Sequence, residues 1–273
     1  MKLARPDVFH PRIVLAGCAR QVAGDGDDDG LVAALRRRGL HAHWLAWDDP
    51  EVRRADLVIL RATHDYADRL DEFLAWTTVV ANLLNAPAVV AWNAHRRYLG
   101  DLAARGVPTV AGEVVSPGER VRLPRTGGVF VGPTVGTGTR RFSDRTAAAA
   151  FIGARHEAVF VQPAESAAEA ELVFLGGEPS HAFPPEPDFE LWDVGAAALA
   201  AAAAELGIDA GELLYARAHL NGARLVELQL VDPSLGWRHL DAGARDLAQR
   251  QFALCVESAL ERLGLGPFSH RRP

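Results

Sequence analysis

The stretch LLYARAHLNGARLVELQLVDPSL, residues 213–235, consists of two alternating runs with a turn between them. Asn221-Gly222 is typical of the two-residue turn that closes a β-hairpin. Side chains two apart on a strand point to the same face, so each run should place a pair of polar groups on one side. We therefore expect four polar side chains on one face of this hairpin: Arg217, His219, Glu227 and Gln229.

Glu227 lies in the apolar run LVELQLV, which indicates a largely buried strand. A buried carboxylate without a partner is costly, so this position predicts a cation beside it. A facing arginine, a metal ion or a bound ligand would each supply one, and a structural ion pair alone would also be sufficient.

The composition of the 273 residues is typical of a globular protein with a sizeable core, because 49% are apolar and 23% are charged. A net charge of -6 argues against nucleic acid or an anionic membrane surface as a partner. Cys18 and Cys255 lie far apart, which argues against a disulfide scaffold or a zinc site. The start of the chain lacks a signal-peptide pattern, and no apolar run has the ~20 residues needed to cross a bilayer. We therefore expect a cytoplasmic protein.

The first third of the chain alternates short apolar runs with helical patterns, which predicts βαβ units and a Rossmann-like parallel sheet. Strands are predicted over residues 12–17, 41–47, 55–63 and 86–93, with a further strand after Pro108. Helices are predicted from Leu31 to Gly39, from about 68 to 80, and from 94 to Gly106. Later in the chain we predict an antiparallel hairpin over 127–142, two strands within 158–183, and helices over 194–206 and 242–263.

The acidic run GDGDDDG, residues 24–30, matches the first positions of a calcium-binding EF-hand loop. The twelfth position is Arg36 instead of the bidentate glutamate, so we expect Asp28 or Asp29 to cap the helix that follows. His41 and His43 share a strand face, but with no further ligands nearby we expect them to face solvent.

Two other segments carry residue types used in nucleophilic or phosphate chemistry. Ser180 and His181 are neighbours on a predicted strand, so their side chains should point to opposite faces and not form a nucleophile-base pair. The glycine-rich run GPTVGTGTRRF cannot be a P-loop, because Lys2 is the only lysine of the chain. A glycine hairpin over a nucleotide and an ordinary tight hairpin both remain open for it.

The order of these motifs resembles the ATP-grasp superfamily, in particular the branch that includes the O-ureidoserine cyclo-ligase of cycloserine biosynthesis. The segments on which this resemblance rests are DLVILRATHDY, VFVGPTVGTGTRRF, AVFVQPAES, LVFLGGEPSHAF, LLYARAHL and VELQLVDPSL. The resemblance implies a mixed α/β and α+β protein, with an N-terminal Rossmann-like preATP-grasp domain and two α+β subdomains enclosing a nucleotide cleft. The implied boundaries are residues 1–92, 93–160 and 161–273.

The activity that the resemblance implies is ATP- and Mg-dependent activation of a small-molecule carboxylate through an acylphosphate, for coupling or cyclisation in biosynthesis. Arg217 matches the charge-stabilising catalytic arginine, and Glu227 and Gln229 match metal ligands. Val161 and Gln162 match the hinge that faces adenine. Proteins of this family are commonly dimers, so a homodimer is expected.

The chain departs from the family pattern at several positions. Gly132 stands where a phosphate-binding lysine precedes proline, and Arg96 stands where a second lysine is usual. Arg96, Arg140 or Arg141 would then have to bind the phosphates. His219 replaces an aspartate that ligates Mg²⁺, and imidazole is a poor ligand for that ion.

Two functions therefore remain open from the sequence. The first is a working ATP-dependent ligase. The second is a degenerate ATP-grasp protein that binds a nucleotide or metabolite, or acts as a non-catalytic partner.

Overall fold

The computed structural model describes residues 10–119, 121–124, 127–184 and 186–266. The chain groups into two units. Unit 1 contains Met1–Pro87, Gly211–Tyr215 and Ser234–Pro273, and unit 2 contains Ala88–Ala210 and Ala216–Pro233. The predicted domain boundaries after residues 92 and 160 stay a prediction.

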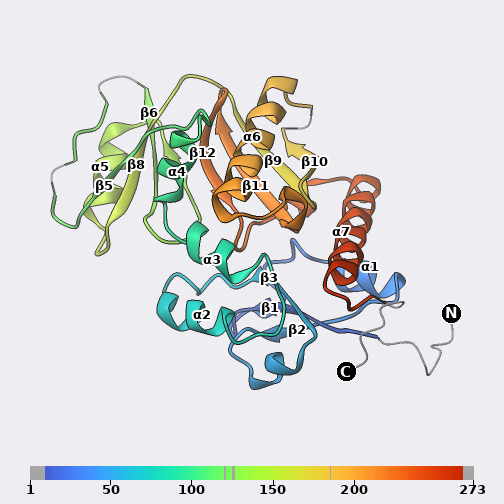
Figure 1. The fold of residues 1–273 in the computed structure, drawn as a ribbon. Helices are drawn as coiled ribbons and strands as arrows, with labels where there is room; N and C mark the ends of the chain where they lie inside the picture. Colours follow the sequence, from blue (N-terminus) through green and yellow to red (C-terminus); the bar gives the residue numbers. More distant parts are fainter. Residues whose placement is uncertain (1–9, 120, 125–126, 185, 267–273) are drawn as a thin grey trace. The chain divides into compact units, whose positions relative to one another are not determined.

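Unit 1 is built on a four-stranded parallel sheet with the strand order β2-β1-β3-β4. Figure 1 labels β1, β2 and β3 of this sheet. Its strands are β1 (Arg12–Gly17), β2 (His41–Ala46), β3 (Leu57–Ala62) and β4 (Leu83–Leu84). β3 is buried along its whole length, as expected for a strand covered on both faces. His41 and His43 on β2 are exposed, which confirms that they face solvent.

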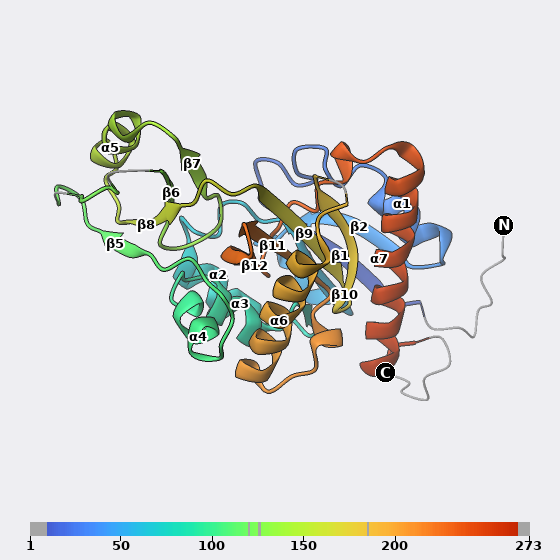
Figure 2. The ribbon, with the colours of Figure 1, turned by 90° about the horizontal axis from the view of Figure 1, so that it is seen from above.

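The helices of unit 1 come from both ends of the chain. They are α1 (Leu31–Arg37), η1 (Pro50–Arg54), α2 (Leu70–Thr77), η3 (Trp237–His239) and α7 (Ala242–Arg262). Figures 1 and 2 both show α7 beside α1, and Arg38 binds Glu257 between them. The η2 turn (Ala210–Glu212) lies where the chain passes between the units.

The acidic run does not cap α1 as predicted. The N-cap of α1 is Gly30, which has a left-handed backbone and makes no side-chain cap bond. Asp27 instead accepts hydrogen bonds from the backbone N–H groups of Gly236 (2.9 Å) and Arg238 (3.1 Å) and from the Ser234 hydroxyl (2.9 Å). The acidic loop thus holds residues from the far end of the chain.

Asp28 is used in the same loop for a buried ion pair. Its carboxylate accepts from Arg61 on β3 at 2.9 Å, and both side chains are almost fully buried. The Arg61 guanidinium also lies over the rings of Tyr215 and Trp237, at 5.2 and 5.8 Å from the ring centroids. Cation–π contacts of this kind help to compensate a buried charge.

The run APAVVAWN, predicted as a strand, forms the helix α3 (Pro87–Asn93). Proline is favoured at the first helical position, and Val89, Val90 and Asn93 are buried on one face of the helix. Asn93 then bonds the backbone of Leu228 and Leu230, which explains why the helix is held in place. The strand expected after Pro108 is reduced to a single bridge between Thr109 and Leu225.

Unit 2 contains two four-stranded sheets, with the orders β5-β8-β6-β7 and β10-β9-β11-β12. The strands of the first are β5 (Glu113–Val115), β6 (Gly128–Pro133), β7 (Arg140–Phe142) and β8 (Val159–Ala164). Those of the second are β9 (Glu169–Leu175), β10 (Glu178–Phe183), β11 (Tyr215–Asn221) and β12 (Arg224–Gln229). β6 and β7, and β11 and β12, pair antiparallel, which confirms both predicted hairpins.

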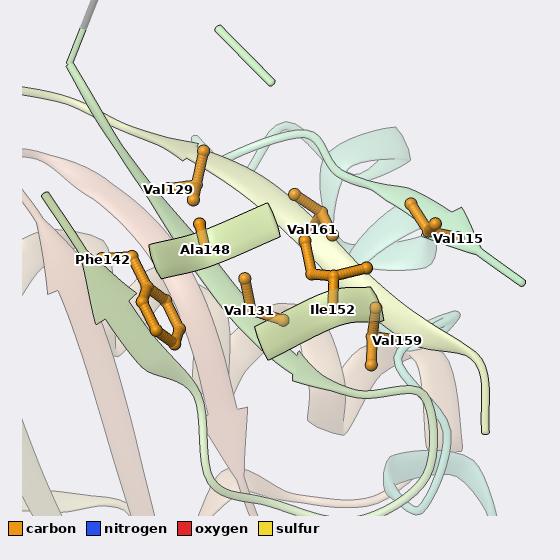
Figure 3. Close-up of a cluster of buried hydrophobic side chains, with 8 residues drawn as sticks. All are labelled: Val115, Val129, Val131, Phe142, Ala148, Ile152, Val159 and Val161. Carbon is orange, nitrogen blue, oxygen red and sulfur yellow. The ribbon is translucent and has the colours of Figure 1, made fainter. Parts of the chain in front are cut away.

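Helices cover one face of each sheet in unit 2. They are α4 (Tyr98–Ala104), α5 (Arg145–Gly153) and α6 (Phe189–Leu206). Figure 3 shows Ala148 and Ile152 of α5 packed against valines of β6 and β8. On the second sheet, Gly195 of α6 lies against Leu172 and Phe174 of β9, so the other face of β9 is left for the polar side chains of the site.

In the described part of the chain, no helix combines the length and the apolar character that a bilayer crossing requires.

Replacing Asp27 by alanine should lower the free energy of unfolding by about 2 kcal/mol, because bonds to a charged acceptor are lost. Burial opposes ionisation of this carboxyl, yet the bonds from Arg238, Ser234 and Gly236 hold its pKa below the ordinary 3.8. The native carboxylate therefore stabilises the protein above that pH, and the gain is lost as pH falls through the lowered pKa. Urea unfolding at neutral and acidic pH measures both effects.

The matched control is Asp25→Ala, which removes a half-exposed ion pair with Arg238. It should cost less than about 1 kcal/mol. Equal losses of unfolding free energy for the two variants would contradict the stabilising role of the Asp27 hydrogen bonds.

Candidate functional site

The β11–β12 hairpin places its polar side chains as the sequence predicts. Arg217 lies opposite Gln229, and His219 lies opposite Glu227. The register shifts just after His219, but the four positions remain on one sheet face. This face looks away from α6 and toward the first sheet of unit 2, since His219 contacts Phe130 of β6 edge to face at 5.4 Å.

Glu227 is buried and paired, as predicted, but its arginine is Arg96 and not Arg217. The Arg96 Nη2 lies 2.8 Å from Glu227 Oε1, and each side chain is only 3% exposed. The hydroxyl of Thr139 donates to the other oxygen, Oε2, at 2.7 Å. Both carboxylate oxygens therefore have a donor from the protein.

Arg96 is held from several sides. Its Nε donates to the Pro133 carbonyl at 3.3 Å, and its Nη2 donates to Thr139 Oγ1 at 2.9 Å. It also bonds the buried Tyr98 phenol, whose own hydroxyl accepts from the Leu228 N–H at 3.0 Å. We call Arg96, Thr139 and Glu227 the buried arginine cluster.

Gly132 makes room for this cluster. A Cβ at this position would lie 3.0 Å from Arg96 Nη2 and 3.1 Å from Thr139 Oγ1. Any larger side chain would have to displace the guanidinium or the hydroxyl. Gly132 is thus the residue that lets Arg96 reach Glu227.

The charge state of Glu227 follows from these contacts. Burial alone would raise the pKa of this carboxyl, because it disfavours the charged form. The Arg96 guanidinium outweighs burial, helped by hydrogen bonds from Thr139 and Gln229 and by the neighbouring His219, and holds the pKa below its ordinary value. Glu227 is an anion at neutral pH.

Arg217 and His219 each pair with a glutamate of β9. Arg217 binds Glu171, and His219 Nε2 lies 2.9 Å from Glu169 Oε2. Arg141 Nη1 binds the same Glu169 at 2.8 Å. Sequence reasoning missed both glutamates, although their i, i+2 spacing in the run EAE is the signal that places them on one strand face.

Arg140 and Arg141 point to opposite sides of β7. Arg140 stacks on Phe142 and Phe151, at 4.8 and 5.5 Å from their ring centroids, which places it on the α5 side. Arg141 lies on the other side, over Phe130 and beside Glu169. Only Arg141 of this predicted phosphate-binding pair shares the face of Arg217.

The predicted adenine hinge lies within β8. Val161 pairs with Glu113 of β5 and Val131 of β6, and its side chain belongs to the core beneath α5 (Figure 3). The Gln162 amide donates to the carbonyls of Val110 (2.8 Å) and Val226 (3.1 Å). Both side chains therefore hold unit 2 together, and their role toward adenine stays a prediction.

Ser180 and His181 differ from the expectation. A register shift in β10 between Pro179 and His181 breaks the alternation of faces. The Ser180 hydroxyl then lies 3.0 Å from His181 Nδ1, so the two side chains do form a pair.

The residues as placed do not offer a divalent ion its usual oxygen ligands. Both oxygens of Glu227 accept from protein donors, Gln229 donates to the same carboxylate, and His219 is bonded to Glu169. Among the residues that the structure describes, no group of three or more His, Cys, Asp or Glu side chains could hold a metal ion. The assignment of Glu227 and Gln229 as metal ligands stays a prediction.

Comparison with known proteins agrees with this architecture. Residues 13–85 match the family described as the N-terminal domain of D-cycloserine synthetase DcsG. The cycloserine biosynthesis protein DcsG of Streptomyces lavendulae is 29% identical over 276 residues, covering 82% of this chain and 92% of the relative.

Solved structures give the same result. The crystal structure of D-cycloserine synthetase DcsG superposes with a TM-score of 0.73 at 28% identity, over 92% of this chain and 99% of the other. The D-alanine–D-alanine ligase of Bacillus anthracis, solved with ATP, superposes with a TM-score of 0.66 at 12% identity, over 93% of this chain and 98% of the other. The chain has the fold of the ATP-grasp ligases. Within that fold class, its sequence and its structure are similar to the branch of D-cycloserine synthetase.

Substitutions in the buried arginine cluster test its importance for the fold. Arg96→Met and Glu227→Leu should each lower the free energy of unfolding by about 3–5 kcal/mol, because each leaves an unpaired buried charge. The double variant should cost clearly less than the sum. Urea unfolding of the four proteins measures this coupling.

The control is the exposed pair of Arg224 and Glu165, each nearly half exposed. Its coupling in the same cycle should be below about 1 kcal/mol. Additive losses at Arg96 and Glu227 would contradict the pairing described here.

Proposed function

We propose that this protein is an ATP-dependent ligase that activates a small-molecule carboxylate and couples it to a nitrogen nucleophile. The observation that carries the proposal is the likeness to D-cycloserine synthetase over nearly the whole chain. The arginine-bearing face of the β11–β12 hairpin supports it, because phosphoryl transfer depends on fixed positive charge beside the reacting groups.

The reaction follows from this chemistry in two steps. A carboxylate oxygen of the substrate attacks the γ-phosphorus of ATP, the bond to the β–γ bridging oxygen breaks, and ADP leaves. A nitrogen then attacks the carbonyl carbon of the acylphosphate, loses a proton, and expels inorganic phosphate. Holding both reactants in one site supplies most of the rate gain that such a step needs.

Arg217 is the proposed catalytic residue. Its side chain is 19% exposed, so it is accessible to a ligand while remaining in a partly desolvated setting. Charge stabilisation is stronger there than in water. Arg141 lies on the same face and is the second candidate for contact with phosphate.

Ligases that use ATP in this way typically take it with Mg²⁺, which neutralises phosphate charge. Glu227 and Gln229, as they are placed, do not fit a protein-bound metal ion. A cytoplasmic location and a homodimer both stay predictions.

The substrate class we propose is an amino-acid-like carboxylate that carries its own nitrogen nucleophile, so that coupling closes a ring. The support is the likeness to a protein described as a D-cycloserine synthetase. O-Ureidoserine, after which the cyclo-ligase of the resembled branch is named, is the first compound to test, followed by other amino-acid carboxylates.

ADP release in the presence of these compounds measures the activity directly. Arg217→Ala should lower kcat by about 10²–10³-fold with the fold intact, because it removes charge stabilisation of the transition state. The control is Arg224→Ala on the neighbouring strand, whose side chain is exposed and bonds Glu165. Equal turnover of the Arg217 variant and the control would contradict the proposed role.

The degenerate alternative makes a different prediction. It allows ADP or AMPPNP to raise the thermal midpoint, as any ligand of the native state does, but no compound would then elicit ADP release.

A further inference from the structure

In the buried arginine cluster, the Glu227 carboxylate already has what a bound metal ion would supply: a partner for each oxygen and a positive charge beside it. Glu227 Oε1 accepts from Arg96, Oε2 accepts from Thr139, and Gln229 adds a further donor. A divalent ion would need at least one of these oxygens. It would therefore have to displace a donor that is already in place.

Arg96 is fixed in its position beside Glu227 by several other contacts. It is held by the Pro133 carbonyl, by Thr139 and by Tyr98, in addition to Glu227. Gly132 leaves the space that its Nη2 occupies. A planar guanidinium with several fixed partners loses little further freedom when it pairs with a carboxylate.

The other arginines of this face are held more loosely. The Arg96 and Glu227 side chains are each 3% exposed, whereas Arg217 and Glu171 are 19% and 33% exposed, and Arg141 and Glu169 are 36% and 32% exposed. Breaking a fully buried pair leaves uncompensated charge in a poorly solvated place, while water can take over at the exposed pairs. An incoming triphosphate will therefore draw Arg217 and Arg141 from their glutamates before it draws Arg96 from Glu227.

We propose that Arg96 takes the place of a divalent metal ion at Glu227, so that a nucleoside triphosphate binds this chain without a metal ion on that carboxylate. The phosphates are then met by Arg217 and Arg141, and any Mg²⁺ that arrives with ATP is held by the phosphates and water. This inference rests on the proposed nucleotide site. It accounts both for the buried position of Arg96 on Glu227 and for the glycine at position 132 that leaves room for it.

Titration of the full-length protein with Mn²⁺ alone, followed by electron paramagnetic resonance, tests the proposal directly. Wild type and Glu227→Gln should show the same Mn²⁺ binding. Arg96→Gln should gain a site with at least about tenfold tighter binding, and the double variant should lose it. Arg224→Gln is the control and should behave as wild type.

Mn²⁺ binding by wild type that Glu227→Gln removes would overturn the proposal, as would an Arg96→Gln protein that folds and gains no site. Circular dichroism reports whether each variant folds. If the buried variants do not fold, the decision rests on the wild-type measurement that follows.

The second measurement uses wild type only and compares AMPPNP affinity in EDTA with that in excess Mg²⁺. A change of less than about tenfold supports the proposal, because Mg²⁺ held by the phosphates and water makes no bond to Glu227. Affinity more than about tenfold tighter with Mg²⁺ overturns it. Absence of AMPPNP binding in both conditions would instead contradict the proposed ligase function, and the Mn²⁺ titration of wild type and its variants would then decide the role of Arg96 by itself.

Discussion

The ion pair between Arg96 and Glu227 is the interaction on which the interior of unit 2 depends. Its members come from separate elements: Arg96 follows α3, Thr139 lies at the end of the glycine-rich turn before β7, and Glu227 lies on β12. The pair thus ties the turn between β6 and β7 to the second sheet. Since neither charge reaches solvent, the three elements must keep their positions for either residue to be tolerated.

This constraint divides the site into a fixed part and an adjustable part. The fixed part is the buried arginine cluster with the Tyr98 phenol behind it. The adjustable part is the row of partly exposed pairs on β7, β9 and β11, in which each arginine has a glutamate that water can solvate when the pair opens. Such an arrangement keeps the site neutral without ligand and still leaves cations to meet an anion.

The sequence predicts the site where local rules are sufficient. The Asn221-Gly222 turn and the alternation around it place Arg217 opposite Gln229 and His219 opposite Glu227, as observed. Burial of Glu227 also follows from its apolar neighbours. The identity of its partner does not, because Arg96 reaches it from a remote segment and only the fold brings the two together.

The remaining errors have equally specific causes. The valines of Pro87–Asn93 favour a strand by propensity, but packing of one face makes the segment a helix. The register shift in β10 is invisible in the alternation that separated Ser180 from His181. The acidic loop offers a plausible helix cap, yet its carboxylates have stronger partners in the backbone near Gly236 and in Arg61.

The hold of Asp27 on Ser234, Gly236 and Arg238 also has a consequence for how the chain acquires its structure. Unit 1 is made of Met1–Pro87, Gly211–Tyr215 and Ser234–Pro273, and both segments of unit 2 lie between the first and the last of these. On the ribosome, the strands of the parallel sheet are synthesised early. The helix α7, which packs against α1, and the hydrogen-bond donors to Asp27 are synthesised only after unit 2. Such long sequence separations slow folding, because the entropy of loop closure is lost before the contacts form. Unit 2 can therefore bury its ion pair before α7, which packs against α1, has been synthesised.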